Sequence, residues 1–348
     1  MRPKVIDVAL KPWDVAPAEV PDGASFGEIA RMLLRFAILA PNSHNTQPWR
    51  FAIGDSYVDF FADRARRLEV VDPNDRSLVI SVAAAIETFS VAAEHFGFES
   101  DVQVQPAGGD EPLIASVSLQ PSQPRSHDLF AAIPHRRTTR MAFEPRELPG
   151  DLLERVRGDA IEKSVELSIV TGDRRSAIAG LVSRGDVVQL DDVRFRRELA
   201  SWVRPNNRGA CDGMRGYGFG FSDLMSRAGP FVIRTFDSGK MQGAKDRRLV
   251  ERSPALLVFA TPVDAPEHWV ATGRVLMRIL LRLTAAGATA SFLNQPIEIP
   301  ELRPRLAATV GLSGLPQLLL RCGYGPTVRP EPRRPIEDVL VEQRRDPR

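Results

Sequence analysis

The densest group of side chains able to bind a polar ligand lies between residues 41 and 49. This segment reads Pro-Asn-Ser-His-Asn-Thr-Gln-Pro-Trp. Each carboxamide carries donors and an acceptor, which suits the imide-like edge of a heterocyclic ring. The alternative is an ordinary polar loop after a helix, with Trp49 packed in the core. The order of the residues, more than their polarity, makes the segment unusual.

A second group is basic. Residues 136–140 read Arg-Arg-Thr-Thr-Arg, which places three guanidinium groups and two hydroxyls within five positions. Guanidinium binds phosphate in a bidentate fashion, and hydroxyls add further donors. A solvated basic turn explains the same pattern equally well. Arg333 and Arg334 form a further pair, which taken alone is more typical of a solubilising tail.

Two glycine-containing segments resemble catalytic motifs less closely. Residues 23–27 match the G-x-S-x-G pattern of hydrolases, but that motif requires a preceding strand, and the upstream sequence is polar and contains proline. A capping box between Ser25 and Glu28 explains the serine better. Residues 216–220 alternate glycine with aromatic residues and lack the Lys-Ser/Thr of a phosphate loop. They favour a mobile lid with apolar contacts.

The bulk composition excludes several classes of protein. The net charge of +2 does not imply nucleic acid binding, and the five histidines show no metal-ligand spacing. Cys211 and Cys322 lie far apart, so neither a disulfide framework nor a zinc site is expected. We see no apolar run of about 18 residues and no signal peptide. We therefore expect a cytoplasmic protein without a membrane partner.

Elements that could position these groups follow from hydrophobic periodicity and turn residues. Helices are expected at 25–40, 78–96, 128–133, 149–156, 176–203, 273–286 and 300–310. Strands are expected at 49–53, 57–61, 101–105, 113–119, 165–171, 255–260, 288–293 and 317–321. Residues 204–250 have little periodicity, and such a long irregular stretch is usually a lid or a binding loop.

The chain is too long for one simple core, so we expect a bilobed unit or two domains. Residues 78–105 and 275–293 both read as an apolar helix, a glycine and a strand, which suggests two related halves. We place an irregular arm at 1–24, the first half at 25–125 and the second half at 126–348. The second half contains the lid or insertion at 204–250.

At this point the sequence resembles a known family. Residues 40–51 resemble the P-S-x-x-N-x-Q-P-W-x-F segment of FMN-dependent nitroreductases, and residues 136–140 resemble their R-R-S-x-R segment. Residues 291–296 and 319–325 resemble later parts of the family's flavin site and its terminal strand. The resemblance covers roughly residues 25–340. It implies an α+β, nitroreductase-like fold.

The order of the two motifs departs from the ordinary family. There the arginine segment comes first, and two subunits of a homodimer share each FMN. Here the arginine segment follows about ninety residues later, and neither motif is duplicated. The arrangement resembles the mycobacterial Acg branch, in which two related α/β halves in one chain mimic the homodimer. We therefore expect one FMN site, a lid over it, and a monomer or weak homodimer.

The resemblance also implies roles for particular residues. Arg136 with the Arg333–Arg334 pair would neutralise the FMN phosphate, Thr138 would donate to the phosphate or ribityl chain, and Arg140 would lie near flavin N1 and O2. The residues implied to bind the cofactor are Pro41, Asn42, Ser43, Asn45, Gln47, Arg136, Arg137, Thr138, Arg140, Asn294, Gln295, Pro296, Arg333 and Arg334. No side chain is an obvious acid or base, and no metal is implied.

The implied activity is that of an oxidoreductase. NAD(P)H would reduce FMN, which would then reduce a small-molecule acceptor such as a nitro compound or quinone. A lid that stays closed would leave instead a non-catalytic protein that binds or sequesters FMN. A third hypothesis is a structural pseudo-dimer that has lost its flavin.

Overall fold

The computed structural model describes residues 8–15, 20–105, 112–207 and 209–342. Its first half is built on an antiparallel sheet with the order β1-β2-β4-β3. The strands are β1 (Trp49–Ile53), β2 (Tyr57–Ala62), β3 (Phe98–Val104) and β4 (Leu113–Pro121). A tight turn at residues 54–56 joins β1 to β2, as the sequence predicts. Helix α1 (Phe26–Ala37) precedes this sheet, and its predicted capping box between Ser25 and Glu28 is confirmed.

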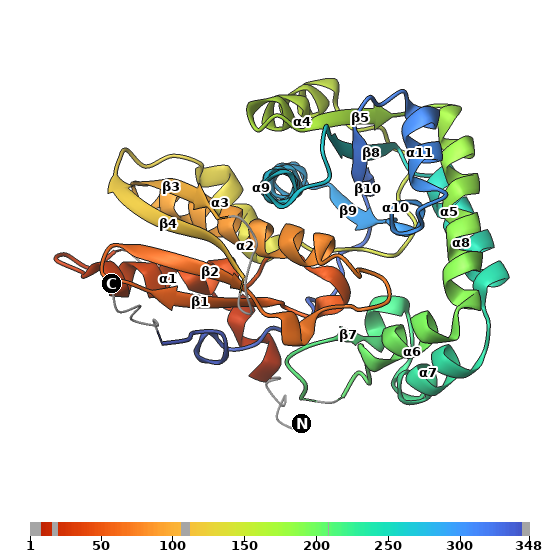
Figure 1. The fold of residues 1–348 in the computed structure, drawn as a ribbon, viewed down its shortest axis with the longest axis horizontal. Coiled ribbons are helices and arrows are strands. Elements are labelled where there is room, and N and C mark those ends of the chain that lie inside the picture. Colours follow the sequence, from red (N-terminus) through yellow and green to blue (C-terminus); the bar gives the residue numbers. More distant parts are fainter. Residues whose placement is uncertain (1–7, 16–19, 106–111, 208, 343–348) are drawn as a thin grey trace.

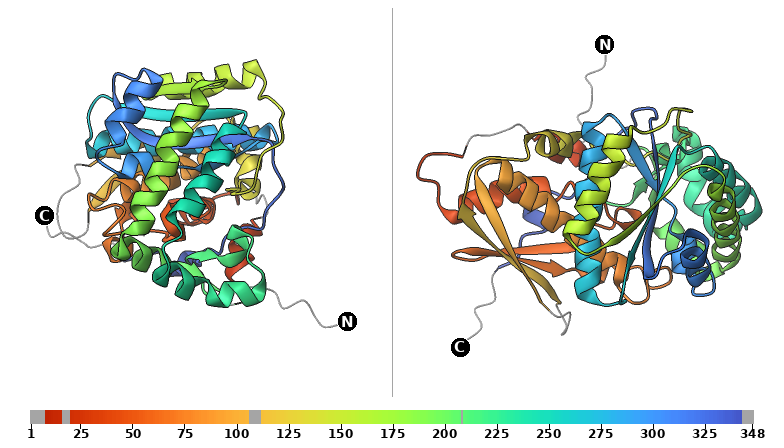
Figure 2. Two further views of the ribbon diagram at one scale, coloured as in Figure 1. Left: turned by 90° about the vertical axis from the view of Figure 1, so that its right-hand side faces the viewer. Right: turned by 90° about the horizontal axis from the view of Figure 1, so that it is seen from above.

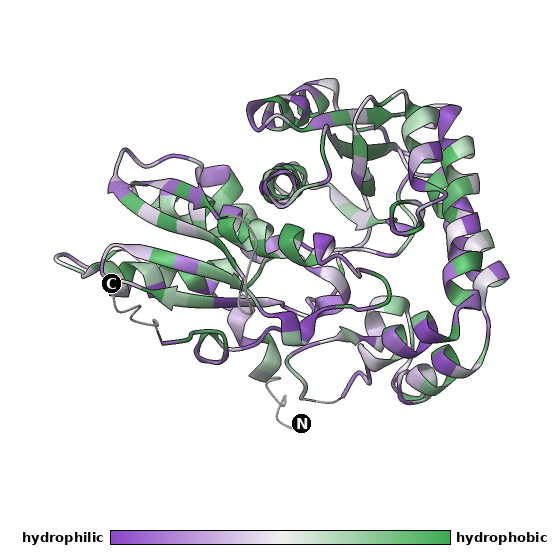
Figure 3. Ribbon diagram, viewed as in Figure 1, coloured by the Kyte–Doolittle hydropathy of each residue, from purple (hydrophilic) through white to green (hydrophobic). Residues whose placement is uncertain are grey.

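The second half is built on a sheet with the order β5-β8-β10-β9, also antiparallel throughout. Its strands are β5 (Glu166–Val170), β8 (Ala255–Thr261), β9 (Thr289–Phe292) and β10 (Leu315–Gly323). Every residue of β8 is buried, which explains why its sequence is apolar without alternation. Figure 3 shows the hydrophobic character of β8 and β10.

The two sheets correspond strand by strand. In each half a helix precedes the first strand, α1 in one and α4 (Gly150–Glu162) in the other. A long helix then precedes the third strand, α2 (Arg76–His95) in one and α9 (Pro266–Ala285) in the other, and a glycine with positive φ follows each long helix. The predicted fold class, α+β with two related halves in one chain, is confirmed.

Helices α2 and α9 pack against each other, and α9 lies between the two sheets (Figures 1 and 2). The contact is close at Gly273, where a Cβ would lie 2.3 Å from the carbonyl oxygen of Ile80. Glu87 of α2 is fully buried and pairs with Arg274 at 2.8 Å and Arg278 at 2.7 Å. Helix α2 is long and apolar enough to cross a membrane, but residues 76–94 of it are buried within the fold.

A helical insertion separates β5 from β8. It comprises α5 (Arg174–Asp191), α6 (Val193–Ser201), α7 (Asp223–Thr235) and α8 (Gly239–Glu251), with the short strands β6 (Val203–Arg204) and β7 (Met214–Arg215) and the 3₁₀ turn η5 (Gly216–Phe219) between α6 and α7. In Figure 1 it forms the edge of the molecule farthest from β1. The expectation of irregular backbone over 204–250 is therefore wrong for most of that stretch.

Glycine and proline account for this error, because both are unfavourable inside helices. Gly239 and Gly243 of α8 allow close packing on α5: a Cβ on Gly243 would lie 2.7 Å from the Ser183 carbonyl oxygen. Pro230 lies inside α7. Tertiary packing has outweighed local propensity in this region.

Shorter elements complete the description. Helices α3 (His127–Ala132), α10 (Gln295–Glu298) and α11 (Arg303–Val310) join the larger ones, and five further 3₁₀ turns are η1 (Val8–Trp13), η2 (Ser43–Asn45), η3 (Arg64–Arg66), η4 (Ile133–His135) and η6 (Ile336–Asp338). The arm at 1–24, expected to be irregular, contains η1.

The tail that follows the second sheet returns to the first. Phe51 donates its backbone N–H to Val339 at 2.8 Å, and Val341 donates to Phe51 at 2.9 Å. Arg333 donates its backbone N–H to Ala9 at 2.9 Å. The tail therefore carries Arg333 and Arg334 from the second half to the end of α1 and the loop that follows it.

Candidate functional site

The loop from Pro41 to Trp49 has an unusual backbone. His44, Asn45 and Gln47 all have positive φ, with values of 49°, 55° and 51°. Such conformations are costly for residues other than glycine and need support from their surroundings. Asn42 supplies part of it: its Oδ1 accepts the Gln47 backbone N–H at 2.8 Å, and its Nδ2 donates to the Ala40 carbonyl at 3.2 Å. Pro41 is buried and Ser43 begins η2.

Asn45 and Gln47 hold neighbouring chain segments. Asn45 Nδ2 donates to the carbonyls of Gly213 and Pro332, at 2.9 and 3.0 Å. Gln47 Nε2 donates to the Cys211 carbonyl at 2.7 Å, and its Oε1 accepts the Arg334 backbone N–H at 2.7 Å. These two amides are therefore engaged by the protein's own chain. In this structure they join the loop to segment 211–219 and to the tail.

Arg136 and Arg333 are the two most deeply buried arginines of the predicted set, with 4% and 3% exposure. Both donate to the Leu39 carbonyl, at 3.4 and 3.3 Å, and Arg333 also donates to Asn45 Oδ1 at 2.7 Å. Thr138 Oγ1 lies 3.5 Å from Arg136. The predicted phosphate-binding groups at 136, 138 and 333 are thus brought together near the C-terminus of α1.

The pair carries positive charge that the described residues do not neutralise at ion-pair distance. The Nε atoms of Arg136 and Arg333 are buried without a hydrogen-bond partner among the described residues. Burial, and for Arg136 the neighbouring Arg333 charge, lower both pKa values below the ordinary arginine range. A buried cation without a counter-ion is costly, so the arrangement favours an anion beside these two groups. A phosphate-bearing cofactor fits this donor set.

Two of the predicted arginines, Arg137 and Arg334, donate to backbone carbonyls nearby. The Arg137 guanidinium lies 4.2 Å from the centre of the Trp13 ring and donates to the carbonyls of Pro134 and Arg136, both at 2.9 Å. Arg334 donates to the Asp338 carbonyl at 2.6 Å. Arg334 is engaged locally, whereas Arg137 lies beside the buried pair, because the Arg333 guanidinium is 5.0 Å from the centre of the same Trp13 ring. The Arg137 charge also contributes to lowering the pKa values of Arg136 and Arg333.

Arg140 lies beneath segment 211–219. Its Nη2 is 3.3 Å from Met214 Sδ, its guanidinium is 4.8 Å from the centre of the Phe219 ring, and Glu331 is 3.9 Å away. A Cβ on Gly218 would lie 2.7 Å from the Glu331 carboxylate, so glycine permits this approach. Burial and the Arg140 charge lower the pKa of His44 to about 4, which keeps that imidazole neutral at pH 7.

Residues 294–296 lie in a polar cluster with Asp186 and Asp246, and the Asp246 charge opposes the lowering of the pKa values of Arg140 and Arg321 by burial. Asn294 Oδ1 accepts the Leu319 backbone N–H at 3.0 Å, and Pro296 is buried in α10. Gln295 Nε2 donates to Asp186 of α5 at 2.9 Å and lies 3.4 Å from Asp246 of α8. The side chain of Gln295 thus ties α10 to the insertion. No recorded contact joins this cluster to Arg136 or Arg333 within the described chain.

The sequence motifs did not assign three residues of this region to the site: His44, Glu331 and Arg321. Arg321 is 1% exposed and donates to the carbonyls of Thr139 and Met141, at 3.2 and 2.8 Å. It therefore fixes the backbone that carries Arg140. A lone arginine inside the apolar run of β10 was the signal that could have identified it.

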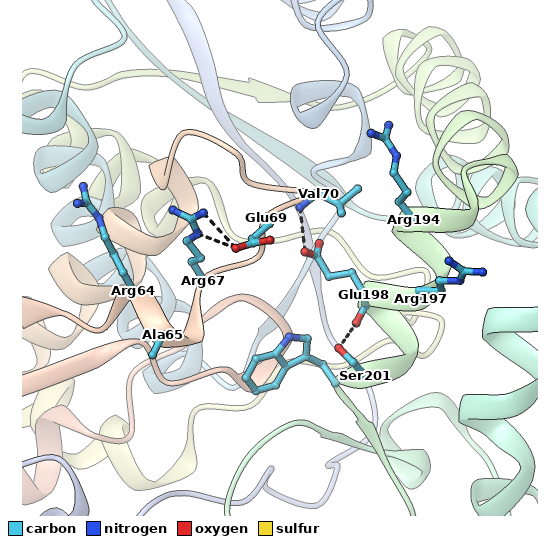
Figure 4. A pocket seen from close by; sticks show the side chains of 10 residues that line it. Arg64, Ala65, Arg67, Glu69, Val70, Arg194, Arg197, Glu198 and Ser201 are labelled. Atoms are coloured by element: carbon cyan, nitrogen blue, oxygen red, sulfur yellow. Dashed lines mark hydrogen bonds and ion pairs between the residues drawn. The ribbon is translucent and has the colours of Figure 1, made fainter. Parts of the chain in front are cut away.

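A surface pocket of about 610 Å³ lies between residues 64–70 and helix α6 (Figure 4). Residues 64–70 of the first half form one wall, and α6 with Trp202 forms the other. Arg66 donates to the Thr46 carbonyl and pairs with Asp212. No group of three potential metal ligands occurs within the described ranges.

Comparison with known proteins identifies the family. No protein-family model matches the chain. “Putative NAD(P)H nitroreductase Rv3131” of Mycobacterium tuberculosis is 30% identical over 321 residues, which cover 90% of this chain and 91% of that protein. The nitroreductase acg of the same organism is 28% identical and is matched over its full length, with 94% of this chain covered. The chain belongs to the NAD(P)H nitroreductase family, in a group that includes acg.

A solved structure described as a putative nitroreductase from Anabaena variabilis shares the fold. It aligns over 91% of both chains with a TM-score of 0.51 and 11% identity. That breadth agrees with a nitroreductase-like fold of double size.

Proposed function

We propose that this protein binds one FMN per chain and transfers electrons from NAD(P)H to a small-molecule acceptor such as a nitro compound or a quinone. The observation that carries the proposal is the buried pair Arg136 and Arg333, whose Nε atoms lack partners among the described residues. The names of the relatives, which specify NAD(P)H nitroreductases, supply the reductant and the reaction class.

Each group near the pair has a distinct role in this proposal. Arg136 and Arg333 bind the phosphate, and Thr138 adds a hydroxyl donor beside Arg136. FMN supplies the capacity to accept a hydride and pass electrons onward. Arg140, held by the backbone that Arg321 positions, contributes a cation for negative charge on the ring. His44 remains neutral beside Arg140 and serves as a hydrogen-bonding group.

Asn45 and Gln47 act through the chain they hold, as positioning residues. Their amides bind the carbonyls of Gly213 and Cys211, so they fix the start of segment 211–219 over Arg140. We infer that this segment is the lid that excludes water from the site. Asn42 supports the same loop by accepting the Gln47 backbone N–H.

A second function, FMN binding without turnover, is favoured by a specific observation. Segment 211–219 is tied to the first half through Asn45, Gln47 and the Arg66–Asp212 pair, and its Met214 and Phe219 lie against Arg140. A segment held so firmly would slow access of NAD(P)H and of an acceptor. The protein would then sequester flavin.

The test begins with an absorbance spectrum of the purified chain and the FMN released per chain on denaturation. We expect one FMN per chain. Rapid mixing with NADPH without oxygen then separates the two functions, because an oxidoreductase bleaches the flavin band and a sequestering protein does not. A colourless chain that fails to bind added FMN would contradict both.

The internal pseudo-dimer provides both halves of the site, so we propose a monomer or a weak homodimer. The two cysteines lie far apart in the sequence, which fits a reducing compartment, and we place the protein in the cytoplasm.

A further inference from the structure

Helix α7 lies at the edge of the molecule and presents an apolar face to solvent (Figure 1). Leu224, Ala228 and Phe231 are spaced by four and three residues, so they lie on one side of the helix. Leu224 is 79% exposed and Phe231 is 54% exposed. Met225 and Val232, which are one heptad apart, are exposed beside them. The apolar face is therefore continuous along the helix.

The opposite side of α7 packs on the rest of the insertion. Ser226 and Gly229 are buried there, and Ser226 Oγ accepts the Asn206 backbone N–H at 3.1 Å. A Cβ on Gly229 would lie 3.4 Å from the Phe221 ring. A surface helix normally turns its apolar side inward and its polar side to water. Helix α7 has a packed inner side and, in addition, an apolar outer side that the described residues leave exposed, which is typical of an interaction surface.

Charged side chains line one edge of this face. Asp223 begins α7, and Arg227 and Arg234 follow at helical spacing on the same side. The Arg234 guanidinium is 5.5 Å from the centre of the Phe231 ring, which places it directly beside the apolar side chains. Asp223 accepts the Asn206 side-chain amide at 2.9 Å, and its carboxylate keeps further acceptor sites. The edge is therefore acidic at the start of the helix and basic at its end.

We propose that this face binds α7 of a second copy of the chain, with the two helices antiparallel about a two-fold axis near Ala228. A two-fold interface uses the same patch of both subunits, so each residue of the patch needs a complement within the patch itself. In this register each Asp223 lies beside the partner's Arg234. The small Ala228 at the axis lets the helices approach closely. An anionic lipid surface would attract the arginines and repel Asp223, so the mixed charge favours a second copy.

The apolar side chains are matched in the same register. Phe231 lies between the partner's Leu224 and the partner's Ala228, and Met225 lies beside the partner's Val232. A contact between two helices of 13 residues buries a small area, so the dimer is weak. We expect association at roughly tens of micromolar and a monomer at or below about 1 µM. This contact is separate from the α2–α9 seam, and it does not depend on the proposed function.

Sedimentation velocity of the full chain at about 1 to 200 µM measures the association. The parent is expected to change from monomer to dimer over this range. Phe231→Ser should weaken the association at least about tenfold, because a central aromatic side chain contributes strongly to such contacts. Ile161→Ser, on α4 at a position that is 75% exposed, is the matched control and should leave it unchanged. Thermal unfolding at the lowest concentration checks that each variant folds as the parent does.

Charge reversal tests the antiparallel orientation. Arg234→Asp should weaken the association about three- to tenfold, because the new carboxylate then faces the partner's Asp223. Asp223→Arg should weaken it by a similar factor, because two arginines then face each other. The two changes together exchange the charges, so they should restore the affinity to within about threefold of the parent.

Three results would overturn the proposal. The parent could remain a monomer over the whole range, Phe231→Ser could associate as tightly as Ile161→Ser, or the double charge variant could associate no more tightly than the single variants. The first result is extended by sedimentation with vesicles that contain phosphatidylserine. A monomer that sediments with them would assign the face to a membrane surface instead of a second copy.

Discussion

The buried pair of Arg136 and Arg333 is the feature that most strongly favours a bound cofactor. The two buried guanidinium groups share one carbonyl and face no carboxylate at ion-pair distance among the described residues. Burial lowers the pKa of both, and the Arg333 charge lowers that of Arg136 further. Without a bound anion, such a pair adds little to the stability of the fold. The same pair beside a phosphate gains charge-assisted hydrogen bonds, which are among the strong ones in proteins.

Replacing Arg136 tests whether the pair binds a phosphate or only supports the fold. Arg136→Met should weaken FMN retention about 10- to 100-fold, because a charge-assisted bond contributes about 1.5–3 kcal/mol. The FMN-free variant should unfold at a temperature no lower than the FMN-free parent, since a repulsive buried charge is removed. Equilibrium dialysis and thermal unfolding measure the two quantities.

Arg174→Met serves as the control for this prediction, because Arg174 is exposed at the start of α5. Equal FMN retention in the two variants would remove Arg136 from the site. A marked loss of stability in the FMN-free Arg136 variant would instead assign it a purely structural role at the end of α1.

At the scale of elements, the position of segment 211–219 depends on its hydrogen bonds to the loop at 41–49. Asn45→Ala removes donors to Gly213 and Pro332 and an acceptor for Arg333. We expect faster amide hydrogen exchange over 211–219 and faster reduction of bound flavin by NADPH. Gln103→Ala, on exposed β3, is a matched amide control. Unchanged exchange in the Asn45 variant would show that the segment is held by other contacts.

The contact between α5 and α8 should depend on pH. Burial and the neighbouring Asp246 raise the pKa of Asp186 to about 8. Because the folded-state pKa lies above the ordinary value of 3.8, the fold binds the proton more tightly than the unfolded chain does. This contribution is present at low pH and is lost as the pH rises through about 8.

Asp186→Asn should therefore flatten the fall in stability between about pH 4 and 8, because the amide imitates the protonated acid. Thermal unfolding at several pH values measures the slope. Asp151→Asn, exposed on α4, is the control. Parallel profiles for the parent and the Asp186 variant would mean that the carboxyl is ionised throughout this range.

For the whole molecule, the seam between α2 and α9 joins two cores. Glu87 is fully buried against Arg274 and Arg278, and breaking a buried ion pair on one side costs about 3–5 kcal/mol. Glu87→Ala should lower the free energy of unfolding by about this amount. Secondary structure and tryptophan fluorescence should still report one shared denaturation curve. Two separate transitions would show that the halves fold independently.

Much of the fold could be predicted because its strands and long helices are strongly periodic or wholly apolar. Residues 255–260 form the buried strand β8, and the helix–glycine–strand repeat corresponds to α2–β3 and α9–β9. Helices α7 and α8 could not be predicted in this way. From the sequence alone, their glycines predict that a helix ends. The close packing of Gly243 on Ser183 of α5 explains why glycine occurs inside α8.

The candidate site was predicted in part for the same reason. Residue types pointed to Arg136 and Thr138 as phosphate donors, whereas only the resemblance to the family grouped Arg333 with them. Which way each side chain faces depends on the tertiary structure: Arg137 is directed to Trp13, and Gln295 to Asp186. Asn45 and Gln47 have amides suited to a ligand, yet they bind backbone carbonyls.

Because the two halves correspond and are covalently joined, the chain should respond to dilution differently from a homodimer. A homodimer of separate subunits dissociates when its concentration falls, so its melting temperature depends on concentration. Here one covalent chain supplies both sides of the α2–α9 contact, and the partner's effective concentration is fixed by the linking chain. The two halves should stay joined at any expression level. The melting temperature should be the same at nanomolar and at micromolar protein.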